Sequence, residues 1–256
     1  MVSFTSLDPP SLSAPAGQAP AGEESAANPT SSHFESLEAV AKAIEACTCS
    51  LCKERTKPVM GEGNPEAEVM LIGEAPGFNE DKQGRPFVGA AGQFLDELLA
   101  SIGLKRTDVF ITNMVHARPP GNRDPLPEEL DASWPYLKAQ IELVAPKLIV
   151  TLGRHSKGKF LPDTDSISRI HGQAFKRKNP ADEVDSPADR QPHSASGFDG
   201  AQWYVALYHP AAGLHKQELK ETIIKDFQTI KKVLTVVRAE SLVLSQIENR
   251  KTQSVS

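Results

Sequence analysis

Four short apolar runs alternate with helical patterns along the chain. The runs are AEVMLIG at 67–73, DVFITN at 108–113, KLIVTLG at 147–153 and WYVALYHP at 203–210. Helical patterns separate the first three, and the first pattern places Phe94, Leu95, Leu98 and Ile102 on one face. Apolar strands that alternate with helices form a parallel sheet covered on both faces. We therefore predict an α/β protein: a three-layer α/β/α domain around a central four-stranded parallel sheet.

Further helical patterns lie around these runs. SLEAVAKAIEAC, from Ser36, has Val40 and Ile44 on one stripe. PEELDASWPYLKAQIELVA, in the second gap, indicates a helix interrupted by Pro135, and a last helix is expected from about Lys216 to Val237.

The ends of the chain and one internal stretch look different from the rest. Residues 1–32 are rich in Pro, Ala and Ser, and without apolar periodicity they cannot offset their ordering entropy, so we predict a disordered tail. The domain then spans residues 33–238, with a hairpin-like excursion and a flexible insertion at about 177–200. Residues 239–256 are expected to form a helical or frayed tail.

Composition sets the broad class. With 256 residues, 39% hydrophobic and 24% charged, the chain has room for one sizeable core. No apolar run approaches the roughly 20 residues of a membrane span, and the N-terminus lacks a secretory pattern. We expect an intracellular, cytoplasmic monomer without membrane contact. The net charge of -5 argues mildly against nucleic acid, but the acidic residues gather in AGEESAA and PADEVDSPAD, so local charge should decide.

Each apolar run ends in a residue that suits chemistry better than packing. These residues are Glu74, Asn113, Gly153 and His209. In open α/β sheets the ligand crevice lies outside the carboxyl ends of the strands, so these residues are expected to share one pocket. Each taken alone also fits an ordinary role, as a turn glutamate, a turn cap or a core histidine. Their joint placement favours a site but does not name a reaction.

Several blocks of the sequence resemble a known family. GEAPGFNEDKQGRPFVGAAGQFLDELL, ITNMVHARPPGNRDPLPEE, LIVTLG, RIHGQAF and LYHPAA occur in the order found in the uracil-DNA glycosylase superfamily. The resemblance covers about residues 46–235 and is closest to the iron–sulfur branch usually called family four. It implies an enzyme of base excision repair that flips uracil out of DNA and hydrolyses its N-glycosidic bond, leaving an abasic site.

The resemblance implies how the base is recognised. Phe87 matches the family's stacking aromatic, and Asn113 matches the asparagine that reads the uracil edge. A carboxamide donates to O4 and accepts from N3–H, whereas cytosine offers the opposite pattern. Glu80 matches the family residue that lies against C5 of uracil, where thymine carries its methyl group. From the sequence alone, a solvated acidic residue in a loop is an equally good interpretation of Glu80. The glycines of GEAPG, with Gly73 first, let the backbone approach the base.

The resemblance also implies the catalytic groups. Some branches place an aspartate one residue after Glu74, where this chain has Ala75. Glu74 and Asn122 are then the candidates that position the water, and His209 is the candidate donor to the departing uracil.

Contacts to DNA are expected from loops beside the pocket. Four basic residues flank it: Arg118, Arg123, His215 and Lys216. Basic loops are often only solvated, but the position of these beside the stretches that grip the strand in this family favours phosphate contact.

The cysteines depart from the family pattern. All three stand in CTCSLC, too few and too local for a disulfide framework, which favours a reduced compartment and a metal or degenerate metal site. The family's [4Fe–4S] cluster takes four cysteines; Cys49 and Cys52 match two of them, while Ala117 and Ser133 replace the others. We therefore predict that the cluster is lost and that the protein has no cofactor. Zinc held by the three cysteines and a histidine is a less favoured alternative.

Two functions of other classes compete with the enzyme. One is a glycosylase-like module that has lost catalysis and binds DNA or a partner. The other is a small-molecule nucleotide hydrolase, which would lack a P-loop or metal motif. Retention of the whole implied set favours the glycosylase; this set is Glu74, Phe87, Asn113, Asn122 and His209.

Overall fold

The computed structural model describes residues 34–161, 166–178, 201–214 and 216–253. The predicted tail at 1–32, His215 and most of the predicted insertion lie outside the described residues, whereas Arg177 and Lys178 are the last residues of a strand.

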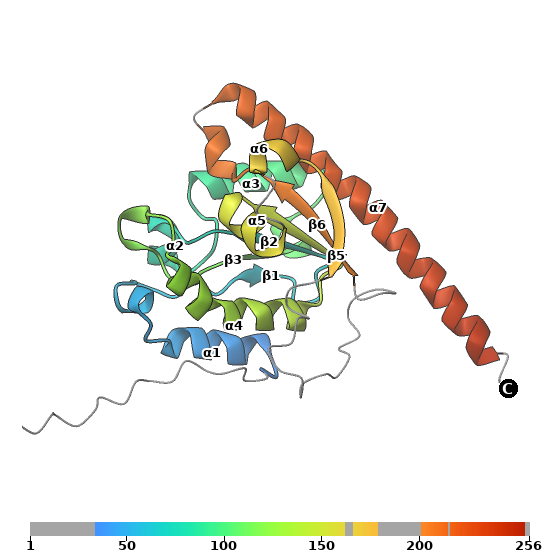
Figure 1. The fold of residues 1–256 in the computed structure, drawn as a ribbon, viewed down its shortest axis with the longest axis horizontal. Coiled ribbons are helices and arrows are strands. Elements are labelled where there is room, and N and C mark those ends of the chain that lie inside the picture. Colours follow the sequence, from blue (N-terminus) through green and yellow to red (C-terminus); the bar gives the residue numbers. More distant parts are fainter. Residues whose placement is uncertain (1–33, 162–165, 179–200, 215, 254–256) are drawn as a thin grey trace, which may run out of the picture.

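A six-stranded sheet forms the middle of the domain (Figure 1). Its spatial order is β1-β3-β2-β4-β6-β5. The strands are β1 (Glu62–Gly63), β2 (Val69–Gly73), β3 (Phe110–Asn113), β4 (Leu148–Leu152), β5 (Ala174–Lys178) and β6 (Ala201–Leu207). The four central strands, β3, β2, β4 and β6, are mutually parallel, which confirms the predicted sheet. The edge strands β1 and β5 pair antiparallel and extend it beyond the prediction.

The central strands are mostly apolar because both faces of the sheet are covered. Every residue of β2 and β4 is buried. Leu71 faces the core formed with α3 (Ala90–Ser101) and α7 (Gln217–Gln253), whereas Ile72 faces the core formed with α4 (Pro127–Val144) and α5 (Arg154–Phe160). Successive residues of a strand point to opposite faces, so a strand between two helical layers reads as a continuous apolar run.

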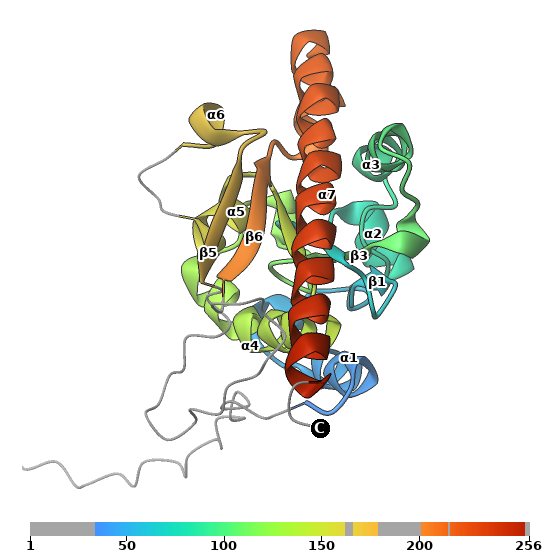
Figure 2. The same cartoon turned by 90° about the vertical axis from the view of Figure 1, so that its right-hand side faces the viewer.

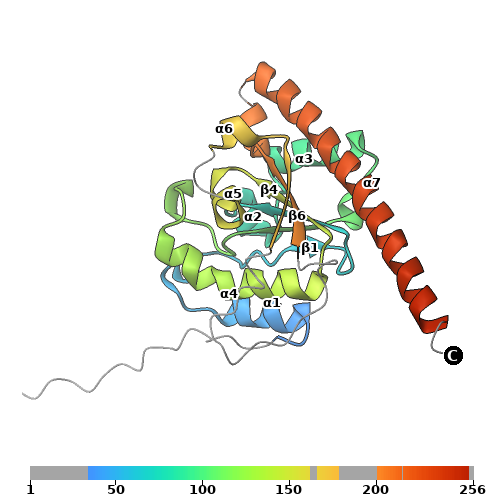
Figure 3. The same cartoon turned by 45° about the vertical axis from the view of Figure 1, so that its right-hand side comes forward.

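The remaining helices surround this three-layer unit. Helix α1 (Leu37–Ala46) packs on α4 through Val40, Ile44 and Tyr136, and lies beside it in Figures 1 and 3. The short helices are α2 (Phe78–Gln83) and α6 (Ile167–Ile170).

Two helices differ from their predicted form. Pro135 lies inside α4 and does not interrupt it. The hydrogen bond that a proline removes would have reached the carbonyl of Asp131, an exposed residue, while the buried side chains of Leu137 and Ile141 hold the helix on the sheet. Helix α7 crosses the sheet in Figure 2 and continues to Gln253, past Val237, the last of its side chains that the structure describes as buried.

Within the described part of the chain, no helix is both long enough and apolar enough to span a bilayer.

Candidate active site

The ends of β2 and β3 bring three predicted residues together. Gly73 and Asn113 are directly paired in the parallel register. A Cβ atom at Gly73 would lie 2.4 Å from Asn113 Oδ1 and 2.6 Å from Phe87 Cζ. Only glycine therefore allows both side chains to lie over the end of β2, which explains the first glycine of the GEAPG turn.

Asn113 has an unpaired acceptor at this point. Its side chain is buried, and Oδ1 has no hydrogen-bond partner among the residues that the structure describes. Buried polar atoms are nearly always paired, so an orphan at a strand end indicates a place for an N–H group of a ligand.

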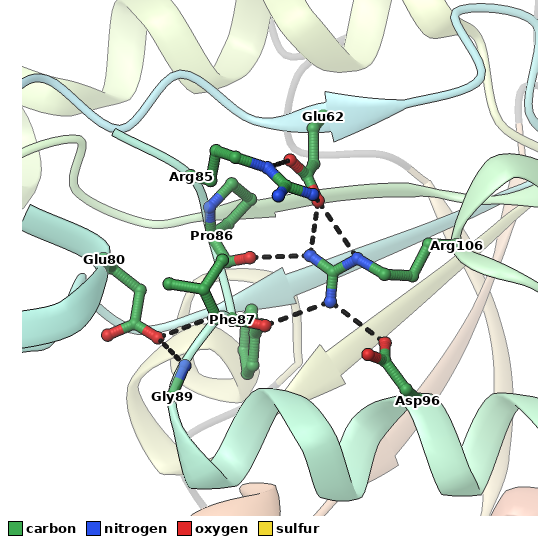
Figure 4. A network of polar contacts seen from close by, with 9 residues as sticks. Glu62, Glu80, Arg85, Pro86, Phe87, Gly89, Asp96 and Arg106 are labelled. Carbon is green, nitrogen blue, oxygen red and sulfur yellow. Dashed lines mark hydrogen bonds and ion pairs between the residues drawn. The ribbon is translucent and has the colours of Figure 1, made fainter. Parts of the chain in front are cut away.

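A strained loop presents Phe87. Its φ of 52° lies in the left-handed region, which costs a bulky residue free energy and persists only when the surroundings impose it. Arg106 imposes it here by donating to the carbonyls of Pro86 (2.7 Å) and Phe87 (3.0 Å) (Figure 4). Glu62 and Asp96 in turn hold the guanidinium, at 2.5 and 3.1 Å.

Glu80 holds the same loop from the other side. Its Oε1 accepts hydrogen bonds of 2.8 Å from the backbone amides of Val88 and Gly89 (Figure 4). The carboxylate thus supports the wall that carries Phe87, and its expected place against C5 of the base stays a prediction.

His209 joins this group from the end of β6. Its ring stacks on Phe87, with centroids 5.5 Å apart and planes 24° apart, and its Cβ lies 3.3 Å from the Cβ position of Gly153. The Ala211 amide donates to Nδ1 at 3.2 Å, so in the neutral ring the proton is on Nε2. Burial lowers the pKa of His209 to about 4, and the ring is a neutral donor near pH 7.

Glu74 has neighbours that the sequence patterns did not reveal. His155 Nε2, in α5, lies 3.8 Å from Glu74 Oε1 and 3.4 Å from Asp124 Oδ2. Arg154 also pairs with Asp124. Burial raises the pKa of the Glu74 carboxyl; His155 opposes this shift and Asp124 adds to it. The only sequence signal for His155 is its place just after the third strand, and solvated residues often occupy such positions.

The polar side chains after β3 already have hydrogen-bond partners within the protein. Asn122 Oδ1 accepts a hydrogen bond of 2.6 Å from Arg118 Nε. Arg123 makes two hydrogen bonds, of 2.8 and 2.6 Å, to the buried carboxylate of Glu129, so its guanidinium is already engaged in an ion pair. Lys216 is exposed. DNA contact by Arg118, Arg123, His215 and Lys216 stays a prediction.

A second site lies where the cysteines meet. The thiols of Cys47, Cys49 and Cys52 lie within 4.8 Å of one another, and Cys49 Sγ is 3.1 Å from Cys52 Sγ. They line one cavity with Ala117 and Ser133, the residues that replace family cysteines. Hydrogen bonds from the other two thiols lower the pKa of Cys47, while the bond to Cys47 raises the pKa of Cys49 and of Cys52. One thiol of the three therefore loses its proton first.

Known proteins of similar sequence bear on the family of the chain. The chain is 42% identical to a type-4 uracil-DNA glycosylase of Sulfurisphaera tokodaii over 78% of this chain and 85% of the relative. It is 41% identical to the type-4 enzyme of Archaeoglobus fulgidus, over 77% and 92%, and 37% identical to that of Thermotoga maritima, over 77% and 94%.

These findings correct the prediction about the cofactor. The chain is similar to type-4 enzymes, the branch whose resemblance implied a [4Fe–4S] cluster, and the cavity gathers three thiols rather than two. The prediction of a lost cluster and no cofactor is therefore wrong. The prediction counted only Cys49 and Cys52 as ligands, whereas the turn after α1 brings the thiol of Cys47 to the same point. Cys47, Cys49 and Cys52 are the residues that would hold a cluster; they supply three of the four thiolates that a [4Fe–4S] cluster normally takes.

The family model described as "Uracil DNA glycosylase superfamily" matches residues 60–231, which include the candidate residues at the strand ends and the loops around them. This match and the similarity to the type-4 enzymes over most of the chain lead to one conclusion: the chain belongs to the uracil-DNA glycosylase superfamily.

Proposed function

We propose that this chain is a uracil-DNA glycosylase, a monofunctional hydrolase that releases uracil from DNA and leaves an abasic site. The observation that carries the proposal is the unpaired, buried Oδ1 of Asn113 beside the ring of Phe87, at the carboxyl ends of the parallel strands. The similarity to type-4 uracil-DNA glycosylases supports the same activity.

Base recognition follows from these two side chains. An enzyme that acts on a base inside DNA must extrude it, at a cost of a few kcal/mol that the pocket recovers by stacking and edge hydrogen bonds. Phe87 supplies the stacking surface. Asn113 accepts from N3–H through Oδ1 and donates to O4; cytosine would leave both groups unpaired, at about 1–3 kcal/mol each.

Glu74 and His209 are placed to stabilise the charges that develop in the reaction. The transition state carries positive charge on the sugar and negative charge on the departing uracil. The Glu74 carboxylate, with Asn122, holds the attacking water and stabilises the sugar cation. His209 donates from Nε2–H to uracil O2, and its low pKa keeps it a neutral hydrogen-bond donor rather than a source of free protons.

Substrate contact outside the pocket is assigned to the basic loops. Arg118, Arg123, His215 and Lys216 are proposed to contact the phosphates of uracil-containing DNA. The monomeric state and the cytoplasmic location stay predictions from the sequence.

Replacing the donor histidine tests the proposal. His209→Ala should lower single-turnover excision by roughly 10²–10³-fold, because a preorganised donor to a developing anion is lost. Affinity for uracil-containing DNA should change only a few-fold, because phosphate contacts dominate it.

His209→Gln, which keeps an N–H donor, should retain more activity than the alanine variant. Normal excision by His209→Ala would contradict the assigned role. A wild-type protein that binds uracil-containing DNA without excising the base would favour the competing binding module.

A further inference from the structure

One aromatic side chain stands outside the pocket and has no role in the proposed reaction. Phe78 is the first residue of α2, directly after the GEAPG turn, and its side chain is 50% exposed. Among the described residues it is the only exposed phenylalanine, and the others are buried or half-buried.

Two cations from different parts of the chain flank the ring. Lys82 Nζ, one turn further along α2, lies 4.3 Å from the ring centroid. Arg118 Cζ, from the loop after β3, lies 5.1 Å from it. Cations this close to an aromatic ring are attracted by its π face. The result is an exposed ring in a positively charged setting.

The ring is linked to the pocket on two sides. Arg118 also donates to Asn122 Oδ1 at 2.6 Å. On the other side, α2 carries Glu80, whose carboxylate binds the amides that follow Phe87. Phe78 is therefore linked through Arg118 to Asn122 and through α2 to the loop that carries Phe87.

We propose that Phe78, Lys82 and Arg118 form a subsite for the nucleobase next to the extruded uracil. The inference rests on the proposed function. When uracil leaves the stack, the neighbouring base loses a stacking partner, and an exposed aromatic ring can replace it. Aromatic rings beside cations are the elements with which proteins bind single-stranded DNA: the ring takes a base and the cations take the phosphates.

The subsite can be tested by removing either partner of the stack. The probe is a single-stranded oligonucleotide with 2′-fluorodeoxyuridine, which resists hydrolysis, and Kd is measured by fluorescence anisotropy. Phe78→Ala should raise Kd roughly 5- to 20-fold, the lower part of the range for a base stacked on an aromatic side chain. Phe78→Trp should keep wild-type affinity. Val236→Ala, which truncates another exposed apolar side chain, is the control and should change nothing.

A double-mutant cycle identifies the partner base. One oligonucleotide lacks the base 5′ to the uracil and another lacks the base 3′ to it. On one of them the effect of Phe78→Ala should shrink to less than twofold, and on the other it should persist.

Two results would overturn the subsite: an unchanged Kd for Phe78→Ala on the intact oligonucleotide, or an equal loss of affinity on all three. The first would assign the exposed ring to a different partner. Failure of the proposed function would look different, because the wild type would then excise no uracil from an ordinary deoxyuridine oligonucleotide.

Discussion

Glu74 lies between two neighbours with opposite effects on its charge. His155 lowers the pKa of its carboxyl, while burial and Asp124 raise it. Catalysis needs the ionised carboxylate, so excision should decline as the pH falls through the pKa of Glu74. The charged groups that act on it are His155, Asp124 and Arg154.

This arrangement predicts opposite shifts for two variants. His155→Ala should move the acid limb of the pH–rate profile to higher pH, because the group that opposes the raised pKa is gone. Asp124→Asn should move it to lower pH, because a nearby negative charge is removed. Single-turnover rates at saturating DNA measure both.

Glu128→Gln, an exposed carboxylate at the start of α4, is the control and should leave the limb unchanged. Shifts of the same sign for the two variants would show that these residues do not set the ionisation of Glu74.

The candidate site residues within motifs could be found from the sequence, whereas the residues that hold them in position could not. Gly73, Asn113 and His209 lie at or just after strand ends that the apolar pattern located, and Phe87, which the family resemblance implied, contacts them from the loop before α3. Arg106 was missed because its partners come from separate segments, and no periodicity links an arginine to Glu62, 44 positions away. The same holds for Arg123, whose ion pair with Glu129 is invisible in the local pattern.

At the scale of elements, the loop that carries Phe87 depends on one arginine. Arg106→Met should free the carbonyls of Pro86 and Phe87, so that the strained residue relaxes and the stacking surface moves. Displacement of a positioning group by about 1 Å costs up to roughly 10²-fold in rate, and we expect a loss of about 10- to 100-fold in excision.

Arg85→Met is the matched control, because Arg85 is 57% exposed and pairs with the same Glu62 without touching the loop carbonyls. Equal losses for both variants, measured in single turnover, would mean that the ion pair and not the carbonyl contacts matters.

The position of Cys47 in the turn after α1 predicts the iron and sulfide content of the protein. Protein prepared without oxygen should contain iron and sulfide, and Cys47→Ala should lose them, because two thiolates remain where three converge. Elemental analysis and visible absorption measure this without reference to activity.

Thr48→Ala, next to Cys47 and exposed, should keep the wild-type content. Equal iron in the Cys47→Ala protein would exclude Cys47 as a ligand.

The elements themselves were predicted to different degrees. The parallel strands were evident because burial on both faces removes the polar positions. The edge strand β5 has the sequence AFKRK, and its three charged residues are typical of a loop. The pairing with β6, which is not visible in the local pattern, stabilises it as a strand. Pro135 was taken as a break because a local rule cannot weigh the burial on either side of it.

At the scale of the whole molecule, the first part of α7 packs on the sheet and its last part extends beyond it. Among the side chains of α7 that the structure describes, the buried ones run from Ile223 to Val237, and the ion pairs of Arg238 with Glu68 and of Glu240 with Lys176 follow directly. Figure 3 shows the helix continuing beyond the sheet after this point.

A chain ending at Val243 should therefore fold normally, with a Tm within about 2 °C of the full chain, because it keeps every buried side chain of α7 that the structure describes. Phe227→Ala, a fully buried residue of the same helix, should instead cost about 3–5 kcal/mol. Thermal unfolding followed by circular dichroism compares them. A large loss of stability on truncation would show that the end of the helix is part of the core.

The hairpin of β5 and β6 has a consequence for labelling the protein. Lys178 pairs with Ala201, so the two strands meet at the amino end of β6. The carboxyl end of β6, which leads to His209, is the other end of the same strand. A tag inserted between Lys178 and Ala201 should therefore leave the spacing of the strand-end residues unchanged and report on DNA binding without entering the site.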